Sequence, residues 1–204
     1  LHQEGFKQFR CTLLNCGDVM QDAALFYANK AKCPDFSLPE HFILATLHRA
    51  ENTDSPERLQ SIIAALEEIA REMPVVIPIH PRTRKKLQEL NFDFKQTRLQ
   101  LVDPVGYLEM VHLLKHCSLV ATDSGGLQKE AYFFKKYCIT LRTETEWVEL
   151  VEQGANIITG WKYEDILNNY KQLKHTTKDV FSSPLYGDGE AGHIIIRELQ
   201  RIDS

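Results

Sequence analysis

Short apolar runs alternate with longer amphipathic stretches along most of this 204-residue chain. The runs are rich in β-branched residues and have the length of strands, whereas the stretches between them have the length and period of helices. This alternation is typical of βαβ units, which build a mostly parallel sheet with helices packed against it. The chain is therefore expected to form an α/β domain. The predicted strands cover residues 10–14, 42–47, 75–79, 99–102, 119–122, 137–141 and 156–158.

The clearest predicted helix covers residues 56–72. Its apolar side chains recur every three or four positions, which places them on one face of the helix. Ser55 suits the N-cap position, Pro56 suits the first helical position, and Pro74 ends the pattern. Further helices are predicted at residues 18–30, 82–90, 106–116, 125–136, 163–174 and 189–201.

The composition is ordinary for a globular protein, with 43% hydrophobic and 25% charged residues. A chain of this length suits one large domain. The net charge of −4 and the scattered Lys and Arg residues argue against a nucleic-acid partner, which needs a clustered basic face. No apolar run approaches the roughly 20 residues needed to cross a bilayer, so we expect no membrane span.

The cysteines bear on the cellular compartment of the protein, and the first residues bear on whether the chain is part of a longer protein. The five cysteines are odd in number and form no Cys-x-x-Cys pair. This pattern argues against a disulfide framework or a structural zinc site and favours the reducing cytoplasm. The chain begins at Leu1 with neither an initiator Met nor the layout of a signal peptide, so we expect a longer protein upstream.

Polar residues follow five of the predicted strands at their carboxyl ends. These ends share one edge of a parallel sheet, and ligands of such folds bind in the crevice there. Charged residues also lie in loops for no special reason, but two histidines and three arginines at one edge favour a common site. The residues concerned are His48, Arg49, His80, Arg82, Asp103, Asp123, Ser124 and Arg142.

The turn Ser124-Gly125-Gly126 follows an apolar strand and opens a predicted helix. Backbone N–H groups at a helix N-terminus attract anions, and glycine lets a phosphate approach the backbone closely. Glu130 lies four residues after Gly126, on the same helix face, where its carboxylate is placed to hold a ribose diol. A Gly-Gly pair is equally an ordinary helix start, so the turn alone does not settle the ligand.

Two other clusters invite a functional interpretation and are better explained by structure. His112 and His116 have the spacing of a metal pair on a helix, but they flank an apolar stripe that predicts a buried face. The basic run at residues 82–86 fits a solvated helix start, and only Arg82 is kept as a possible site residue. No spacing of Ser, His and Asp requires a hydrolytic triad. We expect neither a metal nor a cofactor.

A series of motifs in one order resembles the non-hydrolysing UDP-N-acetylglucosamine 2-epimerase family. The resemblance implies that the chain is the C-terminal, UDP-binding half of a two-domain GT-B fold, in which two Rossmann-like domains face a cleft. The N-terminal domain would then be absent from residues 1–204. The matching segments are Gly17-Asp18-Val19-Met20 with Asp22, Thr46-Leu47-His48-Arg49-Ala50-Glu51-Asn52, Pro78-Ile79-His80-Pro81, Asp103-Pro104 with Tyr107, Thr122-Asp123-Ser124-Gly125-Gly126-Leu127-Gln128-Lys129-Glu130-Ala131, Leu141-Arg142-Thr143-Glu144-Thr145-Glu146 and Tyr186-Gly187-Asp188-Gly189.

The resemblance also implies roles for single residues. The turn at residues 124–126 would hold the diphosphate, Glu130 the ribose hydroxyls, and the region after Tyr107 the uracil. His48 would lie at the catalytic cleft. The residues implied around the phosphates are Arg49, His80 and Arg142.

The implied activity interconverts UDP-N-acetylglucosamine and UDP-N-acetylmannosamine by elimination and re-addition of UDP. Donors around the diphosphate would stabilise the leaving group, while the acid and base for the sugar C2 would lie on the absent domain. The family further implies a homodimer of the intact protein and a role in cell-surface polysaccharide biosynthesis.

Three alternatives to this activity stay open. Ala50 and Trp147-Val148 depart from the family pattern, where a basic residue and Arg-Pro are frequent, so the substrate could be a modified UDP-sugar. The chain could also belong to a non-catalytic nucleotide-sugar-binding module, or to half of a GT-B glycosyltransferase.

Overall fold

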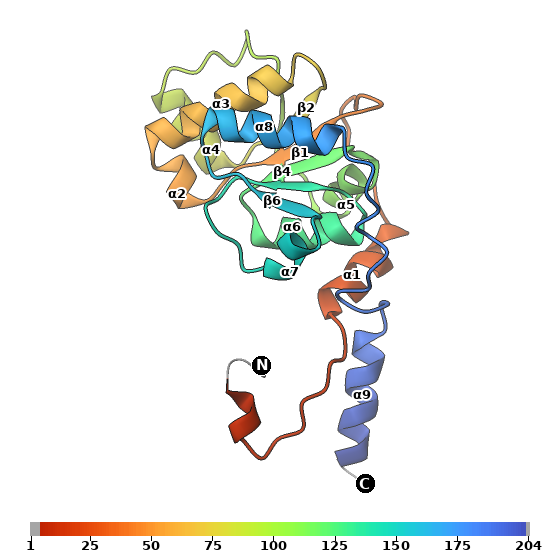
Figure 1. Cartoon of the computed structure of the whole chain (residues 1–204). Helices are drawn as coiled ribbons and strands as arrows, with labels where there is room; N and C mark the ends of the chain where they lie inside the picture. Colours follow the sequence, from red (N-terminus) through yellow and green to blue (C-terminus); the bar gives the residue numbers. More distant parts are fainter. Residues whose placement is uncertain (1–4, 203–204) are drawn as a thin grey trace.

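The centre of the molecule is a six-stranded, entirely parallel sheet with strand order β3-β2-β1-β4-β5-β6 (Figure 1). The computed structural model describes residues 5–202. The order reverses between β1 and β4, and ligands of doubly wound folds bind at that switch point. The strands are β1 (Ile43–Thr46), β2 (Val75–Pro78), β3 (Gln100–Val102), β4 (Leu119–Thr122), β5 (Cys138–Thr140) and β6 (Asn156–Ile158).

Helices cover both faces of the sheet and give three layers (Figure 1). One buried cluster joins the sheet to α3, α4 and α8, and a second joins the opposite face to α5 and α6. The predicted α/β class is confirmed. The helices are α1 (Val19–Ala28), α2 (Ala50–Thr53), α3 (Pro56–Ile69), α4 (Pro81–Glu89), α5 (Tyr107–His116), α6 (Gly125–Phe133), α7 (Val148–Glu152), α8 (Tyr163–Lys174) and α9 (Ala191–Ile202), with a 3₁₀ turn at Phe6–Gln8.

Local sequence signals set most helix boundaries. The Ser55 hydroxyl accepts the Arg58 N–H at 3.4 Å at the start of α3, as its N-cap position predicts. Two short helices, α2 and α7, were not predicted, because single turns carry no periodic apolar pattern. Six of the seven predicted strands are present, with ends that differ by at most one residue.

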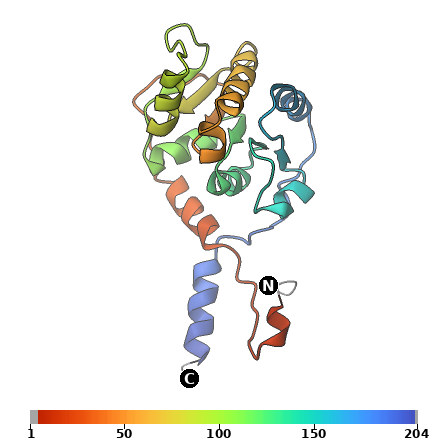
Figure 2. The ribbon, with the colours of Figure 1, turned by 90° about the vertical axis from the view of Figure 1, so that its left-hand side faces the viewer.

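The predicted strand at residues 10–14 is wrong. This segment has no strand partner, and Leu14 is 51% exposed. Figures 1 and 2 show why: the segment leaves the domain and runs well away from the sheet, so no neighbouring strand pairs with its backbone. An apolar run predicts a strand only where the fold supplies that neighbour.

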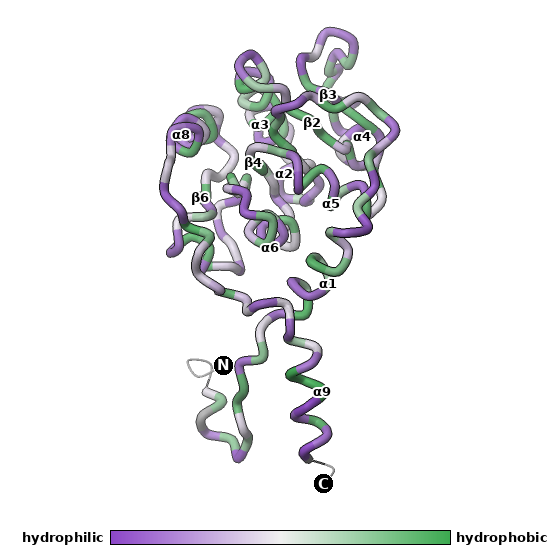
Figure 3. Tube along the Cα trace, turned by 90° about the vertical axis from the view of Figure 1, so that its right-hand side faces the viewer, coloured by the Kyte–Doolittle hydropathy of each residue, from purple (hydrophilic) through white to green (hydrophobic). Residues whose placement is uncertain are grey.

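Helix α9 extends from the same end of the domain as residues 5–16 (Figure 2). Its first turn is held by α1, because the Asp22 carboxylate accepts the Ala191 N–H at 3.2 Å and the Gly192 N–H at 2.7 Å. Beyond that turn, apolar and polar positions alternate along the helix (Figure 3), and Leu199 is 58% exposed. Among the described residues, no helix has the length and apolar character to cross a membrane.

Candidate functional site

Asp123 joins the carboxyl ends of β1 and β4 at the switch point of the sheet. Its fully buried carboxylate accepts the backbone N–H of His48 at 3.1 Å and that of Arg49 at 2.9 Å. The Asn52 side chain donates to the same carboxylate at 3.3 Å and to the Leu141 carbonyl at 2.8 Å. These bonds hold the start of α2 against the end of β4, so the two sides of the site keep a fixed separation.

The turn at residues 124–126 is a helix N-terminus with two available backbone donors. The Ser124 hydroxyl caps α6 by accepting the Leu127 N–H at 3.4 Å. The Ser124 N–H, in contrast, already donates to the Thr122 hydroxyl at 2.9 Å. The donors left for an anion are therefore the N–H groups of Gly125 and Gly126, which an α-helix does not satisfy internally.

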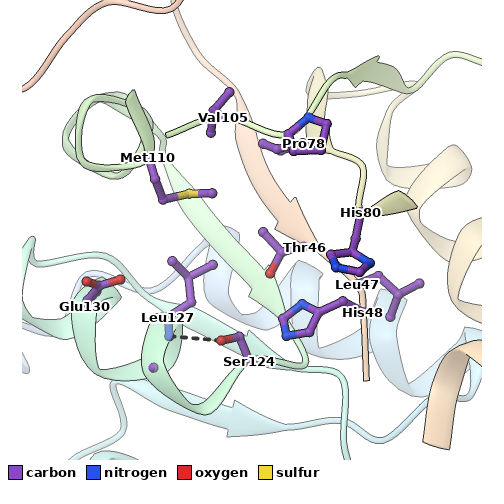
Figure 4. Close-up of a pocket in the computed structure, with 12 residues that line it drawn as sticks. Thr46, Leu47, His48, Pro78, His80, Val105, Met110, Ser124, Leu127 and Glu130 are labelled. Carbon is purple, nitrogen blue, oxygen red and sulfur yellow. Dashed lines mark hydrogen bonds between the residues drawn. The ribbon is translucent and has the colours of Figure 1, made fainter. Parts of the chain in front are cut away.

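A pocket of about 260 Å³ opens at this turn (Figure 4). Its lining combines apolar side chains with a few polar groups, the usual composition of a small-molecule site. Five predicted site residues, His48, His80, Ser124, Gly126 and Glu130, belong to that lining. The other lining residues are Thr46, Leu47, Pro78, Pro104, Val105, Met110 and Leu127.

Two imidazoles face each other on one side of the pocket, with ring centroids 6.0 Å apart. The His80 Nδ1 accepts the Arg82 N–H at 3.2 Å as the N-cap of α4, so a neutral His80 carries its proton on Nε2. The His48 Nδ1 lies 3.5 Å from an Asp123 oxygen. Both rings are thus oriented by a neighbour at Nδ1 and leave Nε2 for a ligand.

Glu130 supplies a buried carboxylate at the other side of the pocket. It is 8% exposed, and burial raises its pKa. The Tyr107 hydroxyl donates a hydrogen bond to it, which acts in the opposite direction and lowers the Glu130 pKa. Burial and the nearby Glu130 charge raise the pKa of Tyr107 to about 12, so this hydroxyl keeps its proton at neutral pH.

Arg142 and Arg49 lie beside the turn, outside the lining of the pocket. Arg142 is 8% exposed and binds Glu146 with both terminal nitrogens, at 2.9 Å and 3.1 Å, while its Nε is 3.3 Å from Glu51. The hydrogen bond to Glu146 is the main cause of the raised Arg142 pKa. An ideal Cβ on Gly125 would lie 3.2 Å from Glu146 and 3.7 Å from Arg49. Roles for both arginines in phosphate binding stay predictions.

The histidine pair and the basic run discussed in the sequence analysis do not form binding sites. His112 and His116 stack with ring centroids 4.1 Å apart, and the His116 Nδ1 is 2.7 Å from the His112 carbonyl oxygen. Within residues 5–202, no group of three or more His, Cys, Asp or Glu side chains is arranged to hold a metal ion. Arg82 bonds Thr53 at 3.0 Å and Asp54 at 2.5 Å, which explains it as a tie between α4 and α2.

Comparison with known proteins identifies the family of the chain. Residues 1–200 match the family model described as UDP-N-acetylglucosamine 2-epimerase. The chain belongs to this family. The resemblance that the sequence motifs carried is confirmed, and it favours an epimerase over a glycosyltransferase.

Two curated relatives show how far the epimerase likeness extends. The UDP-2,3-diacetamido-2,3-dideoxy-D-glucuronate 2-epimerase of Pseudomonas aeruginosa is 48% identical over 205 residues, which cover 99% of this chain and 56% of that protein. The UDP-N-acetylglucosamine 2-epimerase of Methanocaldococcus jannaschii is 40% identical over 167 residues, covering 79% of this chain and 45% of that protein. The chain therefore spans about half the length of the curated relatives it matches.

A solved structure extends the likeness to three dimensions. The M. jannaschii UDP-GlcNAc 2-epimerase, in complex with UDP-GlcNAc and UDP, superposes with a TM-score of 0.81 and 36% identity. The match covers 91% of this chain and 54% of that one. The chain thus has the Rossmann-like α/β fold of one half of the GT-B epimerases.

Several residues that shape the pocket were not named individually from the sequence. Val105 and Met110 form an apolar wall, and Thr46 bonds Thr122 at 2.6 Å beneath the turn. Asp123 was recognised as a polar strand end, but its burial under the turn was not. A polar residue directly after a strand can be recognised in the sequence as a candidate site residue. An apolar side chain on a helix cannot, because core-facing and ligand-facing apolar residues follow the same pattern.

Proposed function

We propose that this chain is the UDP-binding half of a UDP-N-acetylglucosamine 2-epimerase, which interconverts UDP-N-acetylglucosamine and UDP-N-acetylmannosamine. The observation that carries the proposal is one pocket holding both a helix N-terminus and, one turn further along the same helix, the buried carboxylate of Glu130. An anion and a diol at that spacing are the two polar parts of a nucleoside diphosphate. Family membership supports this choice of ligand.

In the proposed complex, the diphosphate lies at the N–H groups of Gly125 and Gly126. The ribose hydroxyls donate to the Glu130 carboxylate, whose two oxygens can accept both hydrogen bonds of a diol. The uracil extends toward the apolar wall formed by Val105 and Met110. His48 and His80 then lie at the other end, where the Nε2 groups reach toward the phosphates and the sugar.

The proposed chemistry makes UDP a leaving group. A base removes the C2 proton, the C1–O electron pair leaves with the β-phosphate, and a C1–C2 double bond remains in the glycal. Re-addition of UDP at C1 and of a proton at the opposite face of C2 completes the epimerisation. Charge develops on the departing phosphate, and preorganised donors at such a position lower a barrier by about 3 kcal/mol each.

This chain contributes leaving-group stabilisation in the proposal. His48 is assigned to the catalytic cleft, and Arg49, His80 and Arg142 to the surroundings of the phosphates. The Arg142 guanidinium already pairs with Glu51 and Glu146, so a bound phosphate would share it with these two carboxylates. The C2 acid and base are assigned to an N-terminal domain outside residues 1–204. The isolated chain should therefore bind UDP and catalyse nothing.

Calorimetry with UDP on this chain tests the binding half of the proposal. The matched variants are Gly126→Ala and Gly192→Ala. A Cβ on Gly126 would lie 3.5 Å from Met20, an ordinary contact, so the variant should fold while adding a methyl group to a lining residue. We expect wild type and Gly192→Ala to bind UDP, and Gly126→Ala to bind at least about tenfold more weakly. A wild-type chain that does not bind UDP contradicts the proposal.

Exchange of the sugar C2 proton tests the catalytic half. An intact protein that carries these residues should incorporate solvent deuterium at C2 of UDP-N-acetylglucosamine, and its His48→Ala variant should do so much more slowly. An intact protein that binds the UDP-sugar without C2 exchange would instead be a binding module. The cytoplasmic location, the polysaccharide role and the homodimer stay predictions.

A modified UDP-sugar is the second candidate substrate. The 48% identity to the P. aeruginosa epimerase named for UDP-2,3-diacetamido-2,3-dideoxy-D-glucuronate favours it. Parallel exchange assays with that sugar nucleotide and with UDP-N-acetylglucosamine discriminate between the two. The ratio of their kcat/KM values identifies the substrate.

A further inference from the structure

Trp147 lies in the loop between β5 and α7 and reaches the proposed phosphate turn from outside the pocket. Its indole Nε1–H donates to the Gly125 carbonyl at 2.8 Å. That carbonyl belongs to the same planar peptide unit as the Gly126 N–H. Because a trans peptide holds its C=O and N–H in opposite directions, fixing one direction also fixes the other.

We propose that Trp147 is a positioning residue that aims the Gly126 N–H into the pocket. This role rests on the proposed function, in which that N–H binds the diphosphate. The indole bond also polarises the peptide group, and a C=O that accepts a hydrogen bond makes its own N–H a stronger donor. Trp147 therefore reinforces the direction that the helix gives this peptide and strengthens its donor, without touching the ligand.

The indole is itself held firmly on its ring face. The Lys129 Nζ lies 4.2 Å from the Trp147 ring centroid and 4.7 Å from that of Tyr186. The Lys129 side chain is 7% exposed and pairs with Asp18, so the cation has little freedom to move away. A desolvated cation over an indole ring is among the stronger cation–π arrangements.

The loop that carries Trp147 is tied to α6 at a second point. The Thr145 hydroxyl donates to the Gln128 side-chain oxygen at 2.6 Å and accepts the Trp147 backbone N–H at 3.1 Å. The indole and this hydroxyl thus contact two consecutive parts of the helix that begins at the turn. Such a support suits precise aiming of the turn more than bulk packing.

The test removes the indole N–H and keeps an aromatic ring at the position. Trp147→Phe keeps an aromatic face over Lys129 and removes the donor to Gly125. Trp161→Phe is the matched control, because Trp161 is the second tryptophan of the chain and does not line the pocket. The Arg58 guanidinium carbon lies 5.6 Å from the centroid of the Trp161 ring. UDP and uridine are titrated by calorimetry into wild type and both variants, since uridine lacks the phosphates.

We expect Trp147→Phe to weaken UDP binding about tenfold and to leave uridine binding within about twofold of wild type. The control variant should bind both like wild type. Selective ¹⁵N-glycine labelling should show an upfield shift of the Gly126 amide in Trp147→Phe. Equal losses for UDP and uridine, or unchanged UDP affinity with an unchanged Gly126 amide, would overturn the positioning role.

A second measurement does not depend on folding of the Trp147 variant. In Trp161→Phe, Trp147 is the remaining tryptophan, and its Nε1–H resonance reports the bond to Gly125. Saturating UDP should shift this resonance and uridine should not. If UDP binds and leaves the resonance unmoved, the positioning role is wrong while the proposed function stands. If wild type binds no UDP, the proposed function itself fails.

Discussion

The carboxylate of Asp123 accepts the backbone N–H of His48 through both oxygens, each at 3.1 Å. One residue ends β4 and the other follows β1, so this contact spans the point where the order of the sheet reverses. The proposed catalytic histidine is therefore placed by its backbone, and the same carboxylate lies 3.5 Å from the His48 Nδ1, which leaves Nε2 for a ligand.

Asp123→Asn should destabilise the chain by about 2 kcal/mol, because the amide keeps one acceptor and turns a donor toward backbone N–H groups. Urea unfolding followed by circular dichroism measures this change. Asp103→Asn is the control, because the Asp103 side chain is 91% exposed in its pair with Arg84. This substitution should change the free energy of unfolding by less than about 0.5 kcal/mol. Equal stabilities of the two variants would contradict the structural role of Asp123.

Glu130 should make stability fall as pH rises above about 4.5. Burial raises its folded-state pKa above the ordinary value of 4.5, so the folded state binds more protons than the unfolded state between the two pKa values. The contribution is present below the unfolded pKa and is lost as pH rises through the folded one. Glu130→Gln removes this dependence.

The measurement for Glu130 is the difference in Tm between Glu130→Gln and wild type at pH 4 and pH 7. That difference should move in favour of the variant at pH 7. A constant difference would contradict the pKa shift. The same variant should bind uridine and UDP more weakly, since an amide accepts a ribose hydroxyl less strongly than a carboxylate does.

Glu146 should have the opposite pH dependence. Its hydrogen bond with Arg142 lowers the Glu146 pKa below the ordinary 4.5, so its contribution is present above that value and is lost as pH falls through the lowered one. Glu146→Gln should therefore lower Tm at pH 7 and converge with wild type in acid. Glu152→Gln on α7 serves as an exposed control. Parallel Tm curves for Glu146→Gln and wild type would sink this prediction.

The Asp18–Lys129 pair should be strongly coupled, because its cation is buried against two aromatic rings. Asp18→Asn keeps the N-cap of α1, where Asp18 accepts the Met20 N–H at 2.7 Å, but leaves the ammonium unpaired. We expect a loss of about 3 kcal/mol in the free energy of unfolding. The double variant Asp18→Asn/Lys129→Met should recover part of it, and strict additivity in urea unfolding would contradict the coupling.

The alternation of apolar runs and amphipathic stretches was sufficient to predict the α/β class and six of the seven proposed strands. It failed at residues 10–14, because pairing depends on a neighbour that a local pattern cannot supply. The polar residues after the strands likewise predicted a common site for His48, His80 and Ser124, because parallel strands end at a common edge. All three line one pocket.

The sequence by itself determined the layers, the edge where the site lies and the family, because periodicity, capping residues and motifs are local properties. Only the tertiary structure decided which donors of the turn stay available. The Thr122 hydroxyl takes the Ser124 N–H, Glu51 and Glu146 hold Arg142, and Trp147 fixes the Gly125 carbonyl. The contacts of Glu51 with Arg142 and of Trp147 with Gly125 join segments brought together by packing. The short-range contacts depend on side-chain directions, which no spacing along the chain encodes.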